Sequence, residues 1–426
     1  MKKILSTALI LSVVLSTLGC KNDAVKSTDP SAKPSAQSTI QSTLEPLTDK
    51  DKKITSDDKV VQSNNKFAFK IYSELLKKEG NIFISPTSIL FCLSMIYNAA
   101  DGKTKEEMEK VLEFTGSSLD EINKANNTLM RQLSNVDAGV KLNIANSLWG
   151  NKSLEFSSDF KKNMSDSYKA EISSLDFSSK KSVDVINEWV KNSTNSKISK
   201  IIDSLSEQDL LVLINAIYFK GTWTNKFEKE LTKDISFKGA TKTKDVPMMS
   251  NFDDYKYVND AGLQGIELPY GKENISMFIF LPGAGQGIAD LNKNMTSEKL
   301  TELIGKLKKK KGKITMPKFK LEYEASLNDA LSTIGMSDAF SDSANLSKLF
   351  AKPVTNSKIS QVKHKTFIDV NEEGTEAAAV TAGTVTATSI MIPEDPFEMN
   401  VDSPFFYVIR DKSTQSILFM GSIFDL

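Results

Sequence analysis

The sequence predicts one large domain of mixed helices and strands, and two kinds of pattern predict it. Apolar residues recur at helical spacing at Phe67, Ile71 and Leu75, as they do on the buried face of an amphipathic helix. Short apolar runs follow, and several are apolar at every position, as in strands covered on both faces. Between about residue 61 and residue 426 no stretch has linker composition and no repeat is visible, so we interpret 61–426 as one domain.

Individual elements follow from local signals. Residues 82–84 are predicted to form a short strand. Ser85 and Pro86 then predict a helix start, because serine caps the first turn and proline is tolerated at the first helical position. The other predicted strands are residues 144–149, 211–219, 276–281, 312–321, 405–409 and 416–423. The lysine-rich run 306–313 is predicted to be the solvated end of a helix, with an anion-binding segment as the alternative.

Composition excludes several classes of protein. The 426 residues contain 54 Lys plus Arg and 54 Asp plus Glu, so they lack the positive excess of a nucleic-acid-binding protein. One histidine and two cysteines are too few for zinc fingers, a His-rich metal site or a disulfide framework. We therefore expect no cofactor, no metal and no nucleic-acid partner.

Motifs for nucleotide binding and hydrolysis are missing or incomplete. There is no G-x-x-x-x-G-K-[ST] loop, and Gly283, Gly285 and Gly287 lack the next glycine of a dinucleotide fingerprint, because residue 288 is isoleucine. A G-x-S-x-G elbow is also missing. His364 is the only imidazole, so a Ser-His-Asp hydrolase would have to use it. The other interpretation of His364 is a hydrogen-bonded structural residue.

The first 20 residues form a predicted targeting segment. Lys2 and Lys3 precede an apolar stretch, residues 4–18, which is shorter than a membrane span of about 20 residues and is typical of a secretion signal. Its end resembles a bacterial lipoprotein signal, which implies that Cys20 is lipidated and becomes the mature N-terminus. Thr17 departs from that pattern, in which an aliphatic residue is preferred. The alternative is a freely extracellular chain with an unmodified Cys20.

Residues 21–60 are predicted to be a flexible tether. They are mainly Ser, Thr, Lys, Asp and Pro, with too few large apolar residues to offset the entropy of ordering. Behind a lipid anchor, the tether would hold the domain at the outer face of a bacterial cell membrane. The predicted organisation is therefore a signal (1–20), a tether (21–60) and one domain (61–426).

Residues 371–393 are the most informative segment. From Ala377 to Ile392 there are 16 residues without charge or proline, mostly small or β-branched, so the segment can form a strand. Alternation places only small residues on one face, at positions 375, 377, 379, 381, 383, 385 and 387. Gly374 is free to act as a hinge. Two interpretations are open: a loop or edge strand, and a strand that inserts into an already packed sheet.

This segment and its surroundings resemble the serpin family. The stretch FIDVNEEGTEAAA, residues 367–379, is nearly identical to the serpin hinge, and further serpin motifs occur in order along the chain. They are NIFISP at 81–86 with Ser88, NAIYFKGTW at 215–223, LPY at 268–270, MPKF at 316–319, PFF at 404–406 and LFMG at 418–421. The resemblance covers the whole predicted domain.

The resemblance implies an α+β fold with three β-sheets, about nine helices and an exposed reactive loop. It also implies inhibition of serine proteases instead of catalysis. In this family the target cleaves the loop and forms an acyl-enzyme, and it is deformed when the cut loop inserts as a strand in the central sheet. Roughly a dozen new ladder hydrogen bonds, at about 0.5–1.5 kcal/mol each, would supply about 10 kcal/mol. The intact form would then be a kinetic trap.

Roles carry over from the family residue by residue. The residues that match its shutter, a polar cluster beneath the central sheet, are Ser85, Ser88, Asn215 and His364. Trp223 matches the breach, where insertion begins. The residues that match the hinge are Glu372, Gly374, Thr375, Ala377, Ala378 and Ala379. Under the resemblance His364 is structural, and the small, uncharged inward positions of the hinge are typical of inhibitory members.

The family also predicts the cleaved bond. Counting Glu372 as the seventeenth residue before it places cleavage between Thr388 and Ser389. The stretch 389–404 is longer than in many members, which leaves other bonds open. The alternatives are cleavage at Ala387, Ile390 or Met391. The small residues up to Thr388 suit elastase-like or subtilisin-like serine proteases, with cysteine proteases as a further class of target.

A monomeric, membrane-anchored protease inhibitor is thus the function that the sequence favours. Three alternatives stay open. The chain could be a serpin-fold protein that is cleaved without trapping its protease, a hydrolase that uses His364, or a lipoprotein that binds small solutes.

Overall fold

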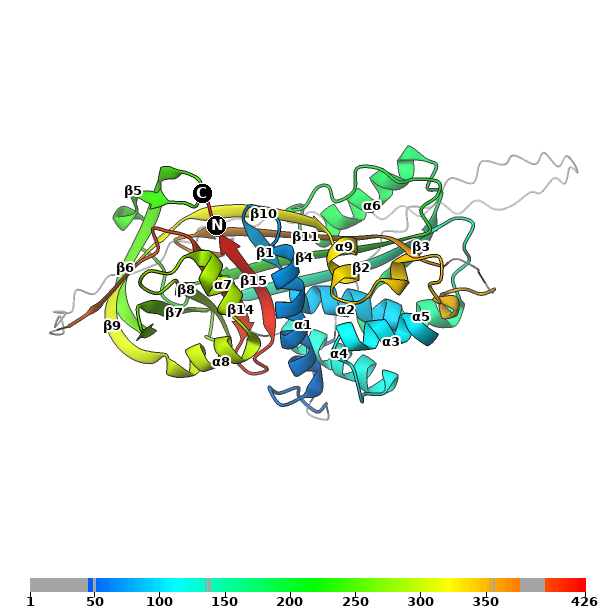
Figure 1. Ribbon diagram of the computed structural model, residues 1–426, viewed down its shortest axis with the longest axis horizontal. Helices are drawn as coiled ribbons and strands as arrows, with labels where there is room; N and C mark the ends of the chain where they lie inside the picture. The colour runs from blue at the N-terminus through cyan, green and yellow to red at the C-terminus, as the bar shows by residue number, and fades with distance from the viewer. Residues whose placement is uncertain are drawn as a thin grey trace, which may run out of the picture. The chain divides into compact units, whose positions relative to one another are not determined.

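The structure is a computed structural model that describes residues 45–48, 51–134, 136, 139–352, 354, 357–375 and 395–426. The described residues form nine α-helices and fifteen strands, which confirms the α+β class (Figure 1). The helices are α1 (Lys59–Leu75), α2 (Pro86–Tyr97), α3 (Gly102–Val111), α4 (Leu119–Ser134), α5 (Ser158–Tyr168), α6 (Lys180–Ser193), α7 (Ile288–Asn294), α8 (Ser297–Lys306) and α9 (Asn328–Thr333). Among these helices, none has the length and apolar character that crossing a membrane requires.

A central sheet of six strands carries the segments of functional interest. Its strands lie in the order β10-β11-β12-β4-β2-β3. Their bounds are β2 (Val140–Asn151), β3 (Glu171–Leu175), β4 (Leu211–Thr222), β10 (Phe319–Ser326), β11 (Ile359–Asn371) and β12 (Gly374–Thr375). Over most of their length β11 and β4 pair directly and in parallel, and the two-residue β12 lies between their ends.

A second, nine-stranded sheet packs against the first. Its order is β1-β15-β14-β8-β7-β6-β9-β13, and β5 pairs with β6. The bounds are β1 (Ile82–Ile84), β5 (Lys233–Lys238), β6 (Thr243–Asp260), β7 (Leu263–Tyr270), β8 (Ile275–Leu281), β9 (Lys308–Pro317), β13 (Phe397–Asn400), β14 (Phe405–Asp411) and β15 (Ile417–Ile423). The long β6 pairs with β5 through its first residues and with β7 through its last. Because β6 is continuous, the strands of two of the three expected sheets are joined here into one hydrogen-bonded sheet.

The central sheet is covered on both faces, as its uniformly apolar strands predicted. Along β4, Leu213 and Ile217 belong to the main core, which includes α2, whereas Val212 and Ile214 belong to a smaller core with α6. Successive side chains of a strand point to opposite faces, which explains this alternation. Figure 1 shows α6 on one side of the sheet and α2 on the other.

Helix α2 begins where the sequence predicted. Ser85 is its N-cap, the Ser85 side chain accepts a hydrogen bond from the Ser88 backbone N–H, and Pro86 occupies the first turn. All 12 residues of α2 are buried, so the helix is a core element behind the central sheet. Aromatic rings then join the two sheets: Phe419 of β15 lies 5.6 Å from Phe219 of β4, measured between ring centroids.

The interpretation of residues 306–313 as a helix end is wrong beyond Lys306. Helix α8 ends at Lys306, and Lys308 begins β9, which pairs with β6 along its whole length. The lysines are compatible with a strand because acidic side chains face them, as Asp254 faces Lys309 at 3.3 Å. The predicted strand 312–321 is correspondingly divided at Lys318 into β9 and β10. Pairing between distant segments decided this, and local charge patterns do not encode it.

Packing begins earlier than the expected domain boundary. Helix α1 starts at Lys59, and Ile54 is buried with its backbone N–H and C=O both bonded to the Gln132 side chain. Arg131 makes two hydrogen bonds with the Asp51 carboxylate. The described residues from Asp51 onward are therefore held against α4.

Candidate functional site

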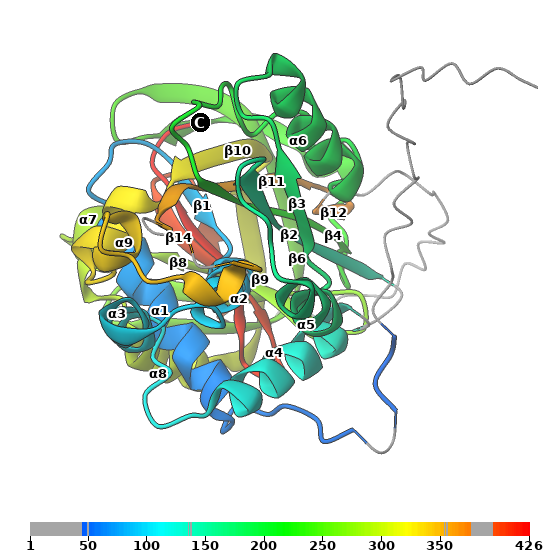
Figure 2. The same ribbon diagram turned by 90° about the vertical axis from the view of Figure 1, so that its right-hand side faces the viewer.

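The start of the candidate loop already lies inside the central sheet. Thr375 pairs with Val370 of β11 on one side and with Gly221 of β4 on the other. Its side chain is fully buried, and Figure 2 shows β12 beside the ends of β11 and β4. Gly374 and Thr375, two residues of the predicted hinge, thus form a short strand between the ends of β11 and β4. Beyond this point β11 and β4 pair directly with each other.

Gly374 occupies a position that only glycine fits. Its φ is +146°, a conformation that side chains disfavour. A Cβ atom at this position would lie 2.1 Å from the Gly221 carbonyl oxygen and 2.7 Å from the Thr222 Cα atom. Any side chain here would push the hinge out of the sheet.

Two carboxylates anchor the turn that leads into β12. Glu372 is buried, binds the Lys318 ammonium at 2.9 Å and accepts a hydrogen bond from the Thr232 hydroxyl at 2.8 Å. Burial alone would raise the pKa of Glu372, but these partners outweigh it and hold the pKa below its ordinary value. Glu373 binds the ammonium groups of Lys226 and Lys229, at 2.6 and 3.3 Å. The acidic pair of the hinge is therefore fully engaged.

Trp223, the residue after β4, closes this end of the sheet. Its ring nitrogen donates to the Asn371 carbonyl at 2.9 Å, and its backbone N–H donates to the Glu373 carbonyl at 2.9 Å. The indole stacks on the Tyr270 ring with 4.3 Å between centroids. Tyr270 comes from β7 of the other sheet, and its hydroxyl lies 2.7 Å from the Thr375 hydroxyl. Backbone and side-chain contacts thus bind the hinge on both sides.

The four residues assigned to the shutter meet in one buried cluster beneath the central sheet. Asn215 of β4 and His364 of β11 are neighbours across the parallel pair. The Asn215 amide donates to the backbone carbonyl of Ser88 at 3.0 Å and also bonds its side-chain hydroxyl. Ser85 donates through its backbone N–H to His364 Nε2 at 3.2 Å and through its hydroxyl to the Leu418 carbonyl at 2.7 Å. The cluster links α2 to two adjacent strands.

These contacts determine the state of the His364 ring. Because Nε2 accepts from Ser85, the ring proton resides on Nδ1, which donates to Asn215 Oδ1 at 2.6 Å. Burial lowers the pKa of His364 from its ordinary 6.5 to about 3, so the ring is neutral at physiological pH. A fully buried ring with both nitrogens bonded offers no base to a substrate.

Comparison with protein families identifies the chain. The sequence model of the family "Serpin (serine protease inhibitor)" matches residues 62–426. This chain belongs to the serpin family. The match covers nearly the whole domain expected at 61–426.

Individual relatives agree with this membership. The serpin is 38% identical to a leukocyte elastase inhibitor of Bos taurus over 380 residues, 85% of this chain and 98% of the relative. It is 35% identical to an uncharacterised serpin-like protein of Thermococcus kodakarensis, over 85% of this chain and 84% of the relative. Among solved structures, the thermophilic serpin tengpin in its native state matches with a TM-score of 0.82 and 34% identity, over 90% of this chain and 97% of tengpin.

The structure adds residues that the sequence reasoning did not single out as site residues. Asn146 of β2 accepts a hydrogen bond from the Asn215 amide at 2.6 Å, which extends the shutter to a third strand. Tyr270 and Lys318 bind the hinge from outside the central sheet. Tyr270 and Lys318 belong to serpin-like motifs, and Asn146 belongs to the predicted strand 144–149, but only the fold shows what the three residues contact. Cys20, the hinge alanines 377–379 and the proposed cleavage residues Thr388 and Ser389 lie outside the described residues.

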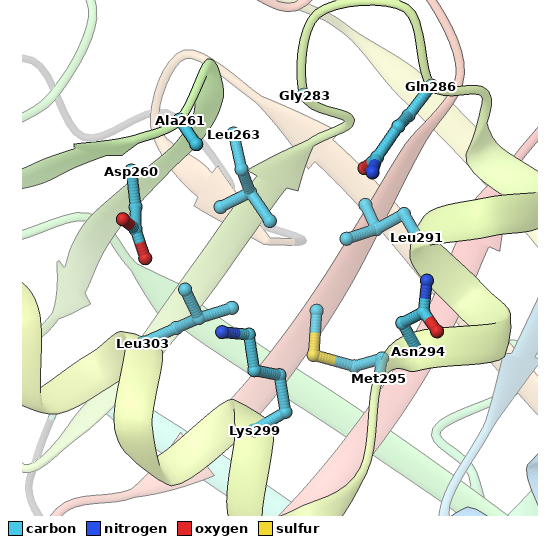
Figure 3. A pocket seen from close by; sticks show the side chains of 10 residues that line it. All are labelled: Asp260, Ala261, Leu263, Gly283, Gln286, Leu291, Asn294, Met295, Lys299 and Leu303. Atoms are coloured by element: carbon cyan, nitrogen blue, oxygen red, sulfur yellow. The ribbon is translucent and has the colours of Figure 1, made fainter.

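A cavity of about 250 Å³ lies elsewhere on this serpin, between the β6–β7 turn, the β8–α7 loop, α7 and α8 (Figure 3). Apolar side chains line it together with two amide and two charged ones, Gln286, Asn294, Asp260 and Lys299. The apolar side chains are Ala261, Leu263, Leu291, Met295 and Leu303. No hinge or shutter residue lines it, so it is separate from the site described above.

Across the described ranges, no cluster of three His, Cys, Asp or Glu side chains could hold a metal ion.

The buried His364 predicts that acid destabilises the intact serpin. The pKa of His364 is about 3 in the folded chain and about 6.5 when unfolded, so between these pH values the unfolded state binds the additional proton. The free energy of unfolding contributed by this ring is therefore complete above about pH 6.5 and falls as the pH drops toward 3. The loss is at most about 5 kcal/mol. Urea denaturation at pH 7, 5.5 and 4.5 measures it.

The matched control for this pH dependence is His364→Gln, which cannot titrate. Carboxylates such as Glu372, with a lowered pKa, also make acid destabilising, but they do so equally in both proteins. The stability difference between wild type and variant should thus shrink as the pH falls. A difference that stays constant from pH 7 to 4.5 would contradict the assignment of acid sensitivity to His364.

Proposed function

We propose that this serpin inhibits serine proteases as a suicide substrate. The observation that carries the proposal is the position of Gly374 and Thr375, which already pair as a strand between β4 and β11. Insertion of the loop would therefore extend an existing strand and need not create a new one. Extension of a strand avoids the unfavourable first step of pairing, because the hinge and its register are already in place.

The register of β12 supports insertion through the whole sheet. Thr375 lies opposite Gly221 in β4 and Val370 in β11, and these two strands are in mutual register down to the shutter. Continued antiparallel pairing would bring residue 381 to the level of Asn215 and His364, and residue 385 opposite Leu211, the first residue of β4. The Asn215–His364 hydrogen bond would have to break for the strands to part. The shutter would then be the resistance that keeps the intact form closed.

The face that would turn inward suits the interior it would enter. Thr375 points into the main core, so alternation assigns positions 377, 379, 381, 383, 385 and 387 to the same face. Those residues are alanine, threonine, glycine or valine, and none is charged. A small, neutral face can enter a close-packed sheet without displacing neighbouring side chains.

The chemistry would follow the normal reaction of the target. The protease serine oxygen attacks the carbonyl carbon of Thr388, the bond to the Ser389 nitrogen breaks, and an ester joins the protease to the shortened loop. The serine proton leaves with the new amino group of Ser389. Insertion then moves the ester and the protease with it, and the deformed active site no longer hydrolyses the ester. The serpin supplies binding and stored free energy and no catalytic group.

The proposed targets are elastase-like or subtilisin-like proteases. The residues before the proposed bond are Val385, Thr386, Ala387 and Thr388, which suit a small apolar pocket and lack the Lys or Arg that a trypsin-like pocket needs. Several relatives are named leukocyte elastase inhibitors, in agreement with that class. Cysteine proteases are a further class that the same mechanism admits.

Incubation with subtilisin or pancreatic elastase tests the proposal. We expect a covalent complex that survives denaturant, with a mass equal to both proteins minus the small peptide that follows the cut. Mass spectrometry of that peptide identifies the bond, with serine as its first residue if Thr388 is correct. A chain that is only clipped, with full protease activity retained, would favour the alternative of a serpin-fold protein that does not trap.

We further propose that Cys20 anchors the monomeric serpin to the outer face of a bacterial cell membrane. The support is the lipoprotein-like signal in residues 1–20. Replacing Cys20 with serine should release the protein from membrane to medium in the producing cells. Retention of the C20S protein in the membrane fraction would contradict the anchor and leave the inhibitory function unaffected.

A further inference from the structure

Tyr270 and Thr375 form an isolated polar pair in an apolar environment. Both side chains are fully buried, and their hydroxyl oxygens are 2.7 Å apart. The Tyr270 ring stacks on Trp223 and meets Phe219 edge-on, with 5.2 Å between the centroids of Tyr270 and Phe219. Burial raises the pKa of Tyr270 well above its ordinary value, so its hydroxyl keeps its proton and can donate to Thr375. Each hydroxyl therefore satisfies the other where water cannot reach.

Thr375 lies beside a close contact between β4 and the Tyr270 ring. Gly221 faces Thr375 across the pair with β4, and a Cβ atom on Gly221 would lie 2.8 Å from the Tyr270 ring. The aromatic ring therefore rests directly on the glycine backbone and ends with its hydroxyl at Thr375. The buried Tyr270 hydroxyl has its partner only where residue 375 carries a hydroxyl, as threonine does.

We propose that Tyr270 is a positioning residue that holds the hinge in the register from which the loop inserts. The inference rests on the proposed function, because register matters only if the loop enters the sheet. Side chains alternate across a strand, so a slip by one residue exchanges the two faces of the whole segment. The residue after Thr375 is Glu376, and such a slip would place its carboxylate against Phe219 and Trp223. Burying an unpaired carboxylate there is strongly unfavourable.

The hydroxyl pair therefore favours the productive register before the loop is cut. The Glu372 and Glu373 side chains bind lysines, and their backbone carbonyls accept hydrogen bonds from the Phe227 and Trp223 N–H groups, so these contacts restrain the turn that precedes the strand. Tyr270 belongs to β7, in the other sheet, and acts on the first inward-pointing side chain of the loop itself. The Tyr270 hydroxyl thus recognises the Thr375 side chain itself, at the point where the loop enters the central sheet.

The test compares Tyr270→Phe and Thr375→Val, which each remove one hydroxyl and keep the shape. Loss of one buried hydrogen bond is expected to raise the exchange rate of the Thr375 amide hydrogen in the intact protein by about 2- to 10-fold. The same variants should raise the number of serpin molecules cleaved per protease trapped by a similar factor. The double variant should be no worse than either single variant, and Thr375→Ser, which keeps a hydroxyl, should behave as wild type.

The matched control is Tyr72→Phe. The Tyr72 hydroxyl is also buried and lies 2.7 Å from the Ser422 hydroxyl, at the contact of α1 with β15. Tyr72→Phe should lower the melting temperature about as much as Tyr270→Phe but leave hinge exchange and trapping unchanged. Equal hinge exchange in wild type and Tyr270→Phe, or additive effects in the double variant, would overturn the role of Tyr270. If wild type itself forms no covalent complex, the proposed function fails, while hinge exchange still reports on the Tyr270–Thr375 pair.

Discussion

Thr375→Arg is expected to abolish the proposed inhibition and leave the serpin an ordinary substrate. Thr375 is fully buried between β4 and β11, and its hydroxyl lies against that of Tyr270. A guanidinium in this apolar site costs several kcal/mol, and each 1.4 kcal/mol is a factor of ten. The hinge would leave the sheet and the loop would stay accessible. Covalent complex should fall at least about 100-fold, while cleavage of the loop continues; gel analysis after reaction with subtilisin measures both.

The control for this experiment is Glu376→Arg. The substitution introduces the same side chain one residue later, at a position that alternation assigns to the outer face. It should therefore trap protease nearly as well as wild type. Trapping that survives in the Thr375→Arg variant would refute the insertion mechanism. Equal loss in both variants would show that positive charge near the hinge interferes with the protease and not with the sheet.

Cleavage of the loop is expected to raise the melting temperature by roughly 20 °C or more. An inserted strand between β4 and β11 would add about a dozen ladder hydrogen bonds, which supplies about 10 kcal/mol. For a domain of this size, each kcal/mol shifts the melting temperature by about 2 °C. Circular dichroism of the intact and the protease-nicked protein measures the shift. The result would establish that the intact fold is metastable.

The nicked Thr375→Arg protein is the control for the thermal measurement. Its loop is cut in the same way but should not insert, so its melting temperature should stay near that of the intact protein. A nicked wild-type protein that melts at the temperature of the intact form would contradict metastability. The same result would remove the source of free energy for deforming a bound protease.

Local sequence signals predicted the elements whose structure depends on neighbouring residues. Ser85 and Pro86 gave the correct start of α2, because capping and proline geometry act within one turn. The apolar runs predicted the buried strands, including β8 and β14, because burial on both faces requires apolar residues throughout. The lysines of β9 were assigned wrongly because their neighbours on β6 are about fifty residues away in the sequence.

The candidate site also has a part that the sequence predicted and a part that only the structure shows. The motifs predicted hinge and shutter residues, and the fold brings Ser85, Ser88, Asn215 and His364 into one cluster. The motifs did not show that Asn146 joins this cluster or that Lys318 binds Glu372. Those contacts join segments that are far apart in the chain, and no spacing in the sequence encodes them.

By itself the sequence indicated that this chain is a serpin, predicted which residues form its hinge, and placed only small, uncharged residues at the positions predicted to point inward. These properties belong to single positions and to alternation along one strand. Only the tertiary structure decided that Gly374 and Thr375 already lie between β4 and β11, with Tyr270 against Thr375. The physical reason is that the pairing free energy of a strand depends on its neighbours, and here three separate segments provide them.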